Sequence, residues 1–165
     1  QGRVTFEGGS FSKALGVQGG ILAGSEDVRT HALNHSRSWL LSGSQPPGVA
    51  AAQKAAIEVL MSEPEHVQRL WDNTSYFKEQ LDSMGFDTGV SETPIVPVMC
   101  GDSRKAQELS SLMKDEGVMV GAIVFPMVAR DKARVRTQMS AGLSREELDT
   151  VLELFDRCGR KLGLI

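Results

Sequence analysis

The stretch that decides the fold is SFSKALGVQGG, residues 10–20, in which one lysine, Lys13, lies between two serines and a run of glycines. Glycines let backbone N–H groups approach an anion closely, and the serine hydroxyls add donors. A lysine amine beside such an anion site suits a Schiff base with a phosphate-bearing aldehyde cofactor. A solvated loop lysine is the alternative that composition alone favours. A nucleotide P-loop does not fit, because Ala14 follows the lysine where that motif requires Ser or Thr.

The segments on either side of this stretch predict an α/β fold. Residues 3–7 and 21–23 are predicted strands, the second one buried because glycines bound an apolar run. Ser25 can cap a helix over residues 26–35 that has acids in its first turn. Residues 36–47, rich in Ser, Gly and Pro, predict a loop.

Two helices are expected to connect this region to the second half of the chain. The alanine-rich residues 48–61 have high helix propensity, and a second helix is predicted from Ser62 to Met84, with Gly85 as its C-cap. The apolar stripe expected to bury this second helix consists of Val67, Leu70, Trp71, Phe77 and Leu81.

The second half of the chain then predicts a small α+β domain with a three-stranded sheet. The predicted strands are residues 95–99, 118–124 and 133–139. Pro97 favours an edge position for the first strand, because proline cannot donate to a central ladder. A helix is expected from residue 103 to Glu116, and the S-R-E-E run starting at Ser144 predicts a capping box with Glu147.

We therefore predict two domains. Residues 1–47 correspond to the remnant of a larger α/β domain that carries the lysine loop, and residues 48–165 to the connecting helices and the small α+β domain. The chain begins Gln1-Gly2-Arg3 without Met, and the glycine-rich loop follows within about one strand. A functional loop usually has scaffold on both sides, so we expect a C-terminal piece of a longer protein.

Composition excludes several classes of function. The net charge of −3 over 165 residues implies no broad basic surface for nucleic acid, and no apolar run is long enough to span a membrane. Cys100 and Cys158 lack metal-ligand spacing and are expected to be reduced, buried residues of a cytoplasmic protein. The histidines are expected to lie on the surface, so no metal site is predicted; they are His31, His35 and His66.

Residues 133–140 carry a second candidate site. In a strand, Arg134 and Arg136 point to one face while Val135 points to the other. Two arginines on one face could bind a substrate carboxylate through paired hydrogen bonds. The alternative is the solvated face of an antiparallel strand, which the alternation alone favours.

Three motifs together resemble the α-oxoamine synthases, which are fold-type-I enzymes that use pyridoxal 5′-phosphate (PLP). They are SFSKALGVQGG, SRSWLLSGSQPPGVAAA and ARVRTQMSAG, and the resemblance runs along essentially all 165 residues. It implies that Lys13 holds PLP as a Schiff base and that Ser10 binds the PLP phosphate. Leu41 and Ser42 match positions that reach the phosphate of the neighbouring subunit in the family's homodimer. Arg136 matches the arginine that binds the amino-acid carboxylate.

Within the family, the tail GRKLGLI and the motif at residues 133–142 resemble most the members that condense glycine with acetyl-CoA to 2-amino-3-oxobutanoate. The resemblance thus implies a Claisen-type acyl transfer from an acyl-CoA. Alanine with pimeloyl-CoA, and serine with a long acyl-CoA, are the alternatives within the family. A class I aminotransferase would carry an arginine where this chain has Ile21. A non-catalytic α/β dimerisation module is the alternative from another class.

Arg134 matches a second arginine of the family, to which no role is assigned. The chain departs from the family pattern in two respects. Leu143 stands where the family often has histidine. The ring-stacking histidine and the pyridine-nitrogen aspartate of the family lie before the lysine, and no residue here matches them. We therefore expect these 165 residues alone to have little or no activity.

Overall fold

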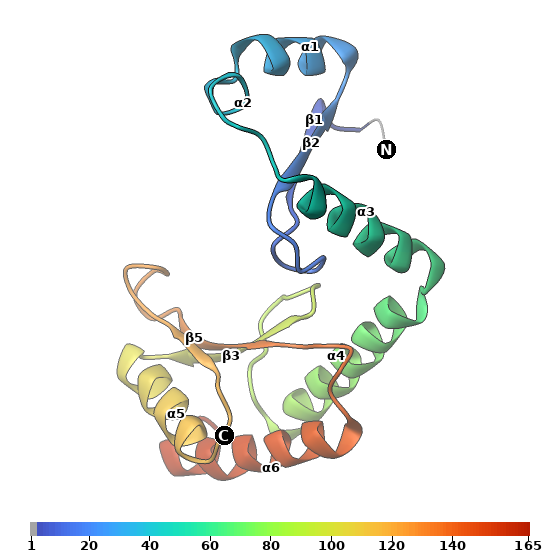
Figure 1. Ribbon diagram of the computed structural model, residues 1–165. Coiled ribbons are helices and arrows are strands. Elements are labelled where there is room, and N and C mark those ends of the chain that lie inside the picture. The colour runs from blue at the N-terminus through green and yellow to red at the C-terminus, as the bar shows by residue number, and fades with distance from the viewer. Residues whose placement is uncertain (1–2) are drawn as a thin grey trace. The chain divides into compact units, whose positions relative to one another are not determined.

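The computed structural model describes residues 3–165, which form two compact units that divide between Pro64 and Glu65 (Figure 1). The predicted boundary between a cofactor-binding domain and a second domain after residue 47 stays a prediction. In the structure, the helix that follows this position belongs to the first unit.

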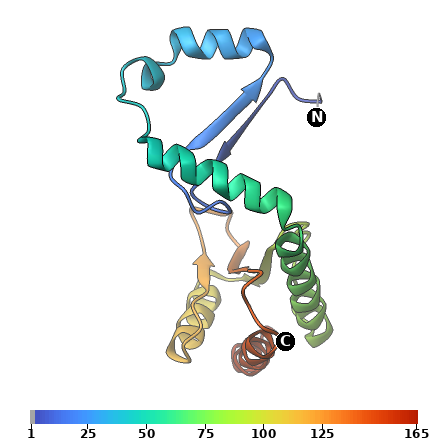
Figure 2. The same cartoon turned by 45° about the vertical axis from the view of Figure 1, so that its right-hand side comes forward.

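The first unit is a β-hairpin followed by three helices. Strands β1 and β2 pair antiparallel, with Phe6 opposite Gly24 and Ser10 opposite Gly20 (Figure 2). Ser25 caps the first helix by accepting a hydrogen bond from the backbone N–H of Val28, as predicted. The elements are β1 (Phe6–Ser10), β2 (Gly20–Gly24), α1 (Glu26–His35), α2 (Arg37–Leu40) and α3 (Pro47–Ser62).

Three expectations for this unit were wrong in detail. The first strand lies at residues 6–10 rather than 3–7. The prediction ended the strand too early because Gly8 and Gly9, which pair in the hairpin, have low strand propensity. Residues 21–23 do form a strand, but both faces of the hairpin are exposed, since two strands alone enclose no core. The predicted loop at 36–47 contains the short helix α2.

The second unit is a three-stranded antiparallel sheet packed against helices. The strand order is β3-β5-β4, so Pro97 lies on an edge strand as predicted. Helices α5 and α6 lie on one face of the sheet (Figure 1), and α4 packs against α6 and β3. The elements are α4 (Glu65–Met84), β3 (Ile95–Gly101), α5 (Ser103–Asp115), β4 (Gly121–Ile123), β5 (Ala133–Gln138) and α6 (Arg145–Leu162).

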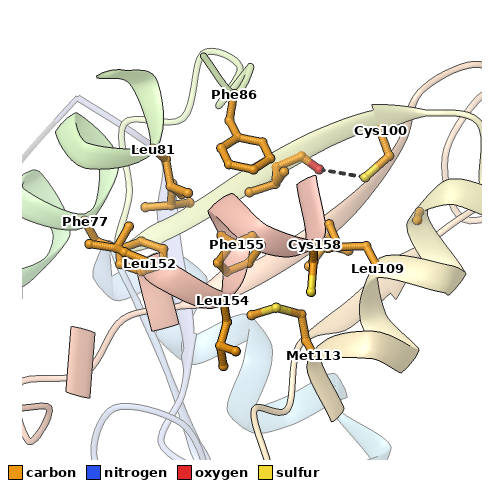
Figure 3. Close-up of a cluster of buried hydrophobic side chains, with 14 of the residues drawn as sticks. Phe77, Leu81, Phe86, Cys100, Leu109, Met113, Leu152, Leu154, Phe155 and Cys158 are labelled. Carbon is orange, nitrogen blue, oxygen red and sulfur yellow. Dashed lines mark hydrogen bonds between the residues drawn. The ribbon is translucent and has the colours of Figure 1, made fainter. Parts of the chain in front are cut away.

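The core of this unit forms where α4, α5 and α6 meet the covered face of the sheet. Phe155 is fully buried at its centre, with edge-on ring contacts to Phe77 at 6.1 Å and to Phe86 at 6.0 Å between ring centroids (Figure 3). Gly159 lies against the Phe86 ring, where a β-carbon would come within 2.4 Å of it. The predicted capping box of Ser144 and Glu147 begins α6.

Helix α4 buries a different stripe from the one expected. Phe77 and Leu81 are fully buried, but Val67 and Trp71 are exposed. Only the C-terminal part of the helix, from Asn73 onward, contributes buried residues to the core. The second expected strand is also shorter, because residues 118–120 lead into β4 without joining the ladder.

Both cysteines are buried and free, as expected. The Cys100 thiol donates to the backbone oxygen of Val98 at 3.4 Å (Figure 3). Burial raises the pKa of the Cys100 thiol, because the thiolate would lose its hydration. This thiol therefore has a structural role in the core.

A polar cluster joins α4 to α6 at the edge of this core. The phenol of Tyr76 donates a hydrogen bond to the carboxylate of Asp149, and the guanidinium of Arg145 lies 3.4 Å from the centroid of the Tyr76 ring. The hydrogen bond to Asp149 is the main cause that raises the pKa of Tyr76 above 10.0, while Arg145 opposes it.

Because Tyr76 is the only tyrosine of the chain, its ionisation can be followed directly by tyrosinate absorbance. We expect it to titrate above pH 10.0 in the folded chain. A raised folded-state pKa means that the cluster stabilises the fold below the unfolded pKa and loses this effect as the pH rises through the folded pKa. Asp149→Asn should lower the pKa of Tyr76, whereas Asp156→Asn, on the same helix, should leave it unchanged. Equal curves for both variants would contradict the assignment.

Candidate functional site

Lys13 lies in the loop that joins β1 to β2, at residues 11–19. The loop is closed by backbone hydrogen bonds from the N–H of Phe11 to the oxygen of Gly19 at 2.9 Å and from the N–H of Val17 to the oxygen of Phe11 at 3.0 Å. A third bond runs from the N–H of Gly16 to the oxygen of Lys13 at 3.0 Å. The Lys13 side chain is exposed, so its amine is accessible to a ligand.

Two hydroxyl groups lie at the start of the same loop. Ser10 is the last residue of β1, and its hydroxyl lies 2.7 Å from that of Ser12. The hydroxyl of Ser10 also accepts a hydrogen bond from the backbone N–H of Ser12 at 3.3 Å. The structure thus brings Ser10, Ser12 and Lys13 together on one short segment, as their spacing in the sequence requires.

A glutamine far along the chain, Gln53, holds this loop and is itself bonded to Gln45, and the sequence analysis missed both. The side-chain amide of Gln53, on α3, donates to the backbone oxygen of Gln18 at 2.6 Å and to the side-chain oxygen of Gln45 at 2.8 Å. A β-carbon on Gly19, which has a φ of +116°, would lie 2.3 Å from Gln45 and 2.5 Å from Gln53. We call Gln45 and Gln53 the glutamine clip. No local pattern signals it, because Gln53 lies 35 residues from the Gln18 carbonyl that it holds.

The close approach of β2 to β1 also requires glycine at position 20. A β-carbon there would lie 2.6 Å from the backbone oxygen of Gly9 on the opposite strand. Two glycines of the quoted motif, Gly19 and Gly20, therefore have a steric reason in the geometry of the loop.

Leu41 and Ser42 lie just after α2 on the same unit. Leu41 is 84% exposed, and the hydroxyl of Ser42 accepts a hydrogen bond from the backbone N–H of Ser44 at 3.4 Å. Neither residue has a hydrogen bond to the lysine loop within residues 3–165. Their expected position at a neighbouring subunit stays a prediction.

Arg136 lies in the middle of β5, opposite Pro97 on β3 and Gly121 on β4. The strand alternates as predicted: Ala133, Val135 and Thr137 are buried, and Arg136 is exposed on the face away from the helices. On the buried face, the hydroxyl of Thr137 donates a hydrogen bond to the backbone oxygen of Val96 at 2.6 Å. Arg136 and Lys13 lie in different units.

Leu143, His31 and His35 do not form a metal-ligand cluster in the described part of the chain. Leu143, where the resembled family often has histidine, packs against the core, and its backbone oxygen accepts from Asn73 at 3.0 Å. His31 and His35 are exposed and stack on each other with ring centroids 4.4 Å apart. Across residues 3–165, no three metal-ligating side chains gather, and no helix is long and apolar enough to cross a membrane.

The glutamine clip gives a first test of how the lysine loop is held. Replacing Gln53 by Ala removes both hydrogen bonds, each of which contributes about 1 kcal/mol. We expect the amide protons of Phe11 and Val17 to exchange about tenfold faster in Gln53→Ala, because the loop opens more readily. Lys54→Ala, one residue along the same helix, should leave them unchanged. Unaltered exchange in Gln53→Ala would show that the clip does not hold the loop.

The chain is similar to known enzymes along nearly its whole length. It is 52% identical over 164 residues to the 8-amino-7-oxononanoate synthase of Symbiobacterium thermophilum and 44% identical over 164 residues to 8-amino-7-oxononanoate synthase 1 of Bacillus subtilis. Each alignment covers 99% of this chain and 42% of the relative, so the chain spans less than half the length of these relatives.

A solved structure shows the same fold. The structure of SPT with its PLP internal aldimine superimposes with a TM-score of 0.91 and 29% identity, covering 99% of this chain and 42% of the other. The expected α/β fold of the C-terminal part of a fold-type-I enzyme is therefore confirmed, and PLP is the cofactor of this fold family. The family model for aminotransferase class I and II matches residues 3–155. The chain belongs to the aminotransferase class I and II family, with its similarity to the α-oxoamine synthases within it.

Proposed function

We propose that this chain is the part of a PLP-dependent acyltransferase that carries the Schiff-base lysine, Lys13, and the substrate-carboxylate arginine, Arg136. The observation that carries the proposal is the position of Lys13. It lies exposed in a glycine-rich loop beside two hydroxyls, in a chain 52% identical to an 8-amino-7-oxononanoate synthase. The reaction would join the α-carbon of an amino acid to an acyl group and release coenzyme A.

The relatives favour one substrate pair over the one expected from the sequence motifs. The two curated relatives are named 8-amino-7-oxononanoate synthases, which supports alanine with pimeloyl-CoA. Glycine with acetyl-CoA, the reaction of glycine C-acetyltransferase, is unconfirmed. It remains the second candidate because of the motifs at residues 133–142 and 159–165. Both candidates are the same kind of reaction, a carbon–carbon bond formation between an amino acid and an acyl-CoA.

The lysine loop fits the phosphate end of PLP. The hydroxyls of Ser10 and Ser12 lie side by side, and the close hairpin at Gly19 and Gly20 leaves no room for side chains there. Oriented hydroxyl and backbone donors of this kind bind phosphate. When bound, PLP would supply an electron sink that makes the α-proton of the amino acid removable.

The residues of the chain then have distinct tasks. The Nζ of Lys13, freed by the incoming amine, would accept the proton from the α-carbon, since it starts next to that carbon. Arg136 would bind the amino-acid carboxylate with its planar guanidinium and so fix the orientation of the α-carbon. The glutamine clip would hold the loop while the lysine exchanges partners.

We further infer that the whole protein works as a homodimer. In this arrangement Leu41 and Ser42 of one subunit would contact the phosphate in the other. The proposal is supported by the exposure of both residues, since Leu41 is 84% exposed and an exposed leucine is available for an interface. A non-catalytic dimerisation module would use the same surface but would not require an accessible Lys13.

Chemical trapping tests the role of Lys13. The full-length protein is incubated with PLP, reduced with borohydride and mapped by mass spectrometry. We expect a single modified peptide that contains Lys13, lost in Lys13→Ala and retained in Lys54→Ala, because only a lysine beside the phosphate site is selected. Label scattered over surface lysines, or no label, would contradict the enzyme and favour the non-catalytic module.

Steady-state kinetics of the full-length enzyme test Arg136. Arg136→Gln should raise the KM for the amino acid about 10- to 100-fold, the usual effect of losing charged hydrogen bonds to a carboxylate. Trapping at Lys13 should persist in this variant, since Arg136 is proposed to bind the amino-acid carboxylate and not the cofactor. Gln138→Ala, on the same face of β5, serves as the matched control and should keep its KM. An unchanged KM in Arg136→Gln would remove this arginine from the substrate site.

A further inference from the structure

The outer face of the sheet in the second unit carries a groove of about 660 Å³ next to Arg136. It is bordered by β3, by β4 and β5, and by residues 87–93 and 128–132. The groove lies wholly within this unit.

Three cations and one acid face this groove. The cations are Lys132, Arg134 and Arg136, and the acid is Asp87. The carboxylate of Asp87 already accepts the backbone N–H of Gly89 at 2.8 Å. The groove therefore has an excess of positive charge, which favours an anionic ligand.

Arg134 is partly fixed in this groove. Its Nε donates to the backbone oxygen of Lys132 at 3.1 Å, which holds the guanidinium near the strand. Its two terminal nitrogens have no hydrogen bond or ion pair to any other residue in the stretch 3–165. A guanidinium anchored at one nitrogen and free at the other two is suited to paired hydrogen bonds with a carboxylate.

The surroundings of Arg134 are apolar. Its cross-strand neighbours are Met99 on β3 and Ile123 on β4, and Val128 lines the same groove. Val90, on the rim, is 97% exposed. An apolar groove with a few placed polar groups is typical of sites for small molecules. This groove thus suits an aliphatic chain that ends in an anionic group.

We propose that Arg134 binds the terminal carboxylate of a dicarboxylic acyl chain, while Arg136 binds the carboxylate of the amino acid. The inference rests on the function proposed above and specifies its acyl donor. It gives Arg134 a task that the sequence resemblance left unassigned, and Lys132 adds positive charge beside it. The groove would thereby select acyl chains that carry a carboxylate at the far end.

The spacing of the two arginines agrees with such a ligand. Residues two apart on a strand lie about 6.6 Å apart along it. In the precursor of 8-amino-7-oxononanoate that still carries the amino-acid carboxylate, eight bonds separate the two carboxyl carbons. At about 1.2 Å per bond in an extended chain, this is ~10 Å. Arginine side chains are flexible enough to accommodate the difference, so both carboxylates can be bound at once.

Binding measurements on the full-length PLP-loaded enzyme test this subsite without requiring turnover. Calorimetry compares pimeloyl-CoA with heptanoyl-CoA, which has the same chain length but ends in a methyl group. We expect the wild type to bind pimeloyl-CoA about tenfold more tightly or better. Arg134→Gln should abolish this difference and Arg134→Lys should restore part of it. Arg104→Gln, an exposed arginine on α5, should retain it in full.

Two outcomes would overturn the subsite. Equal weakening of both thioesters in Arg134→Gln would show that this arginine binds the phosphates of coenzyme A instead. Equal affinity of the wild type for both thioesters would show that no carboxylate is recognised. Failure of the proposed function would be seen in a different experiment. An enzyme of another kind would not show selective trapping of PLP at Lys13, whatever its affinity for the two thioesters.

Discussion

The second unit depends on the alternation of side chains along β5. This strand is central in the sheet, so its backbone is paired on both sides and its register is fixed by β3 and β4. Val135 must face the helices, where it is fully buried, and this places Arg134 and Arg136 together on the opposite face. A shift of register by one residue would bury both arginines and expose the core. The packing of the core therefore determines which residues can meet a substrate.

The lysine loop of the first unit is held in a different way. Few apolar side chains are buried near it, and its conformation depends instead on backbone hydrogen bonds within the loop and on the glutamine clip. Such a loop can open at low cost. This is compatible with the proposed role of Lys13, which would release and regain a bound partner during each turnover. The backbone of β5 is held on both sides, whereas the lysine loop opens more easily, and this difference suits the tasks proposed for the two segments.

Local sequence patterns predicted most of this fold correctly. The caps at Ser25 and Ser144 and the edge position of Pro97 follow from short-range chemistry that the structure repeats. Burial in the hairpin and along α4 was predicted less well. Apolar runs at 21–23 and at Trp71 look buried in sequence, but burial depends on which elements pack beside them.

The same distinction applies to the candidate site. Lys13 and Ser10 could be chosen as candidate site residues because the motif that contains them spans only a few residues. Arg136 could be chosen because the alternation of the strand predicts on which face of the sheet it lies. The glutamine clip and the apolar neighbours of Arg134 could not be found in this way, because they depend on contacts between distant segments.

The central claim, that the protein containing this chain joins an amino acid to an acyl group, is tested most directly by identifying its product. The full-length enzyme is supplied with alanine and pimeloyl-CoA, or with glycine and acetyl-CoA, and the products are analysed by mass spectrometry together with the released thiol. The account predicts 8-amino-7-oxononanoate from the first pair, with one free coenzyme A and one CO2, lost from the alanine carboxylate, for each molecule formed. Transfer of the amino group without a new carbon–carbon bond, or no thiol release with either pair, would contradict it.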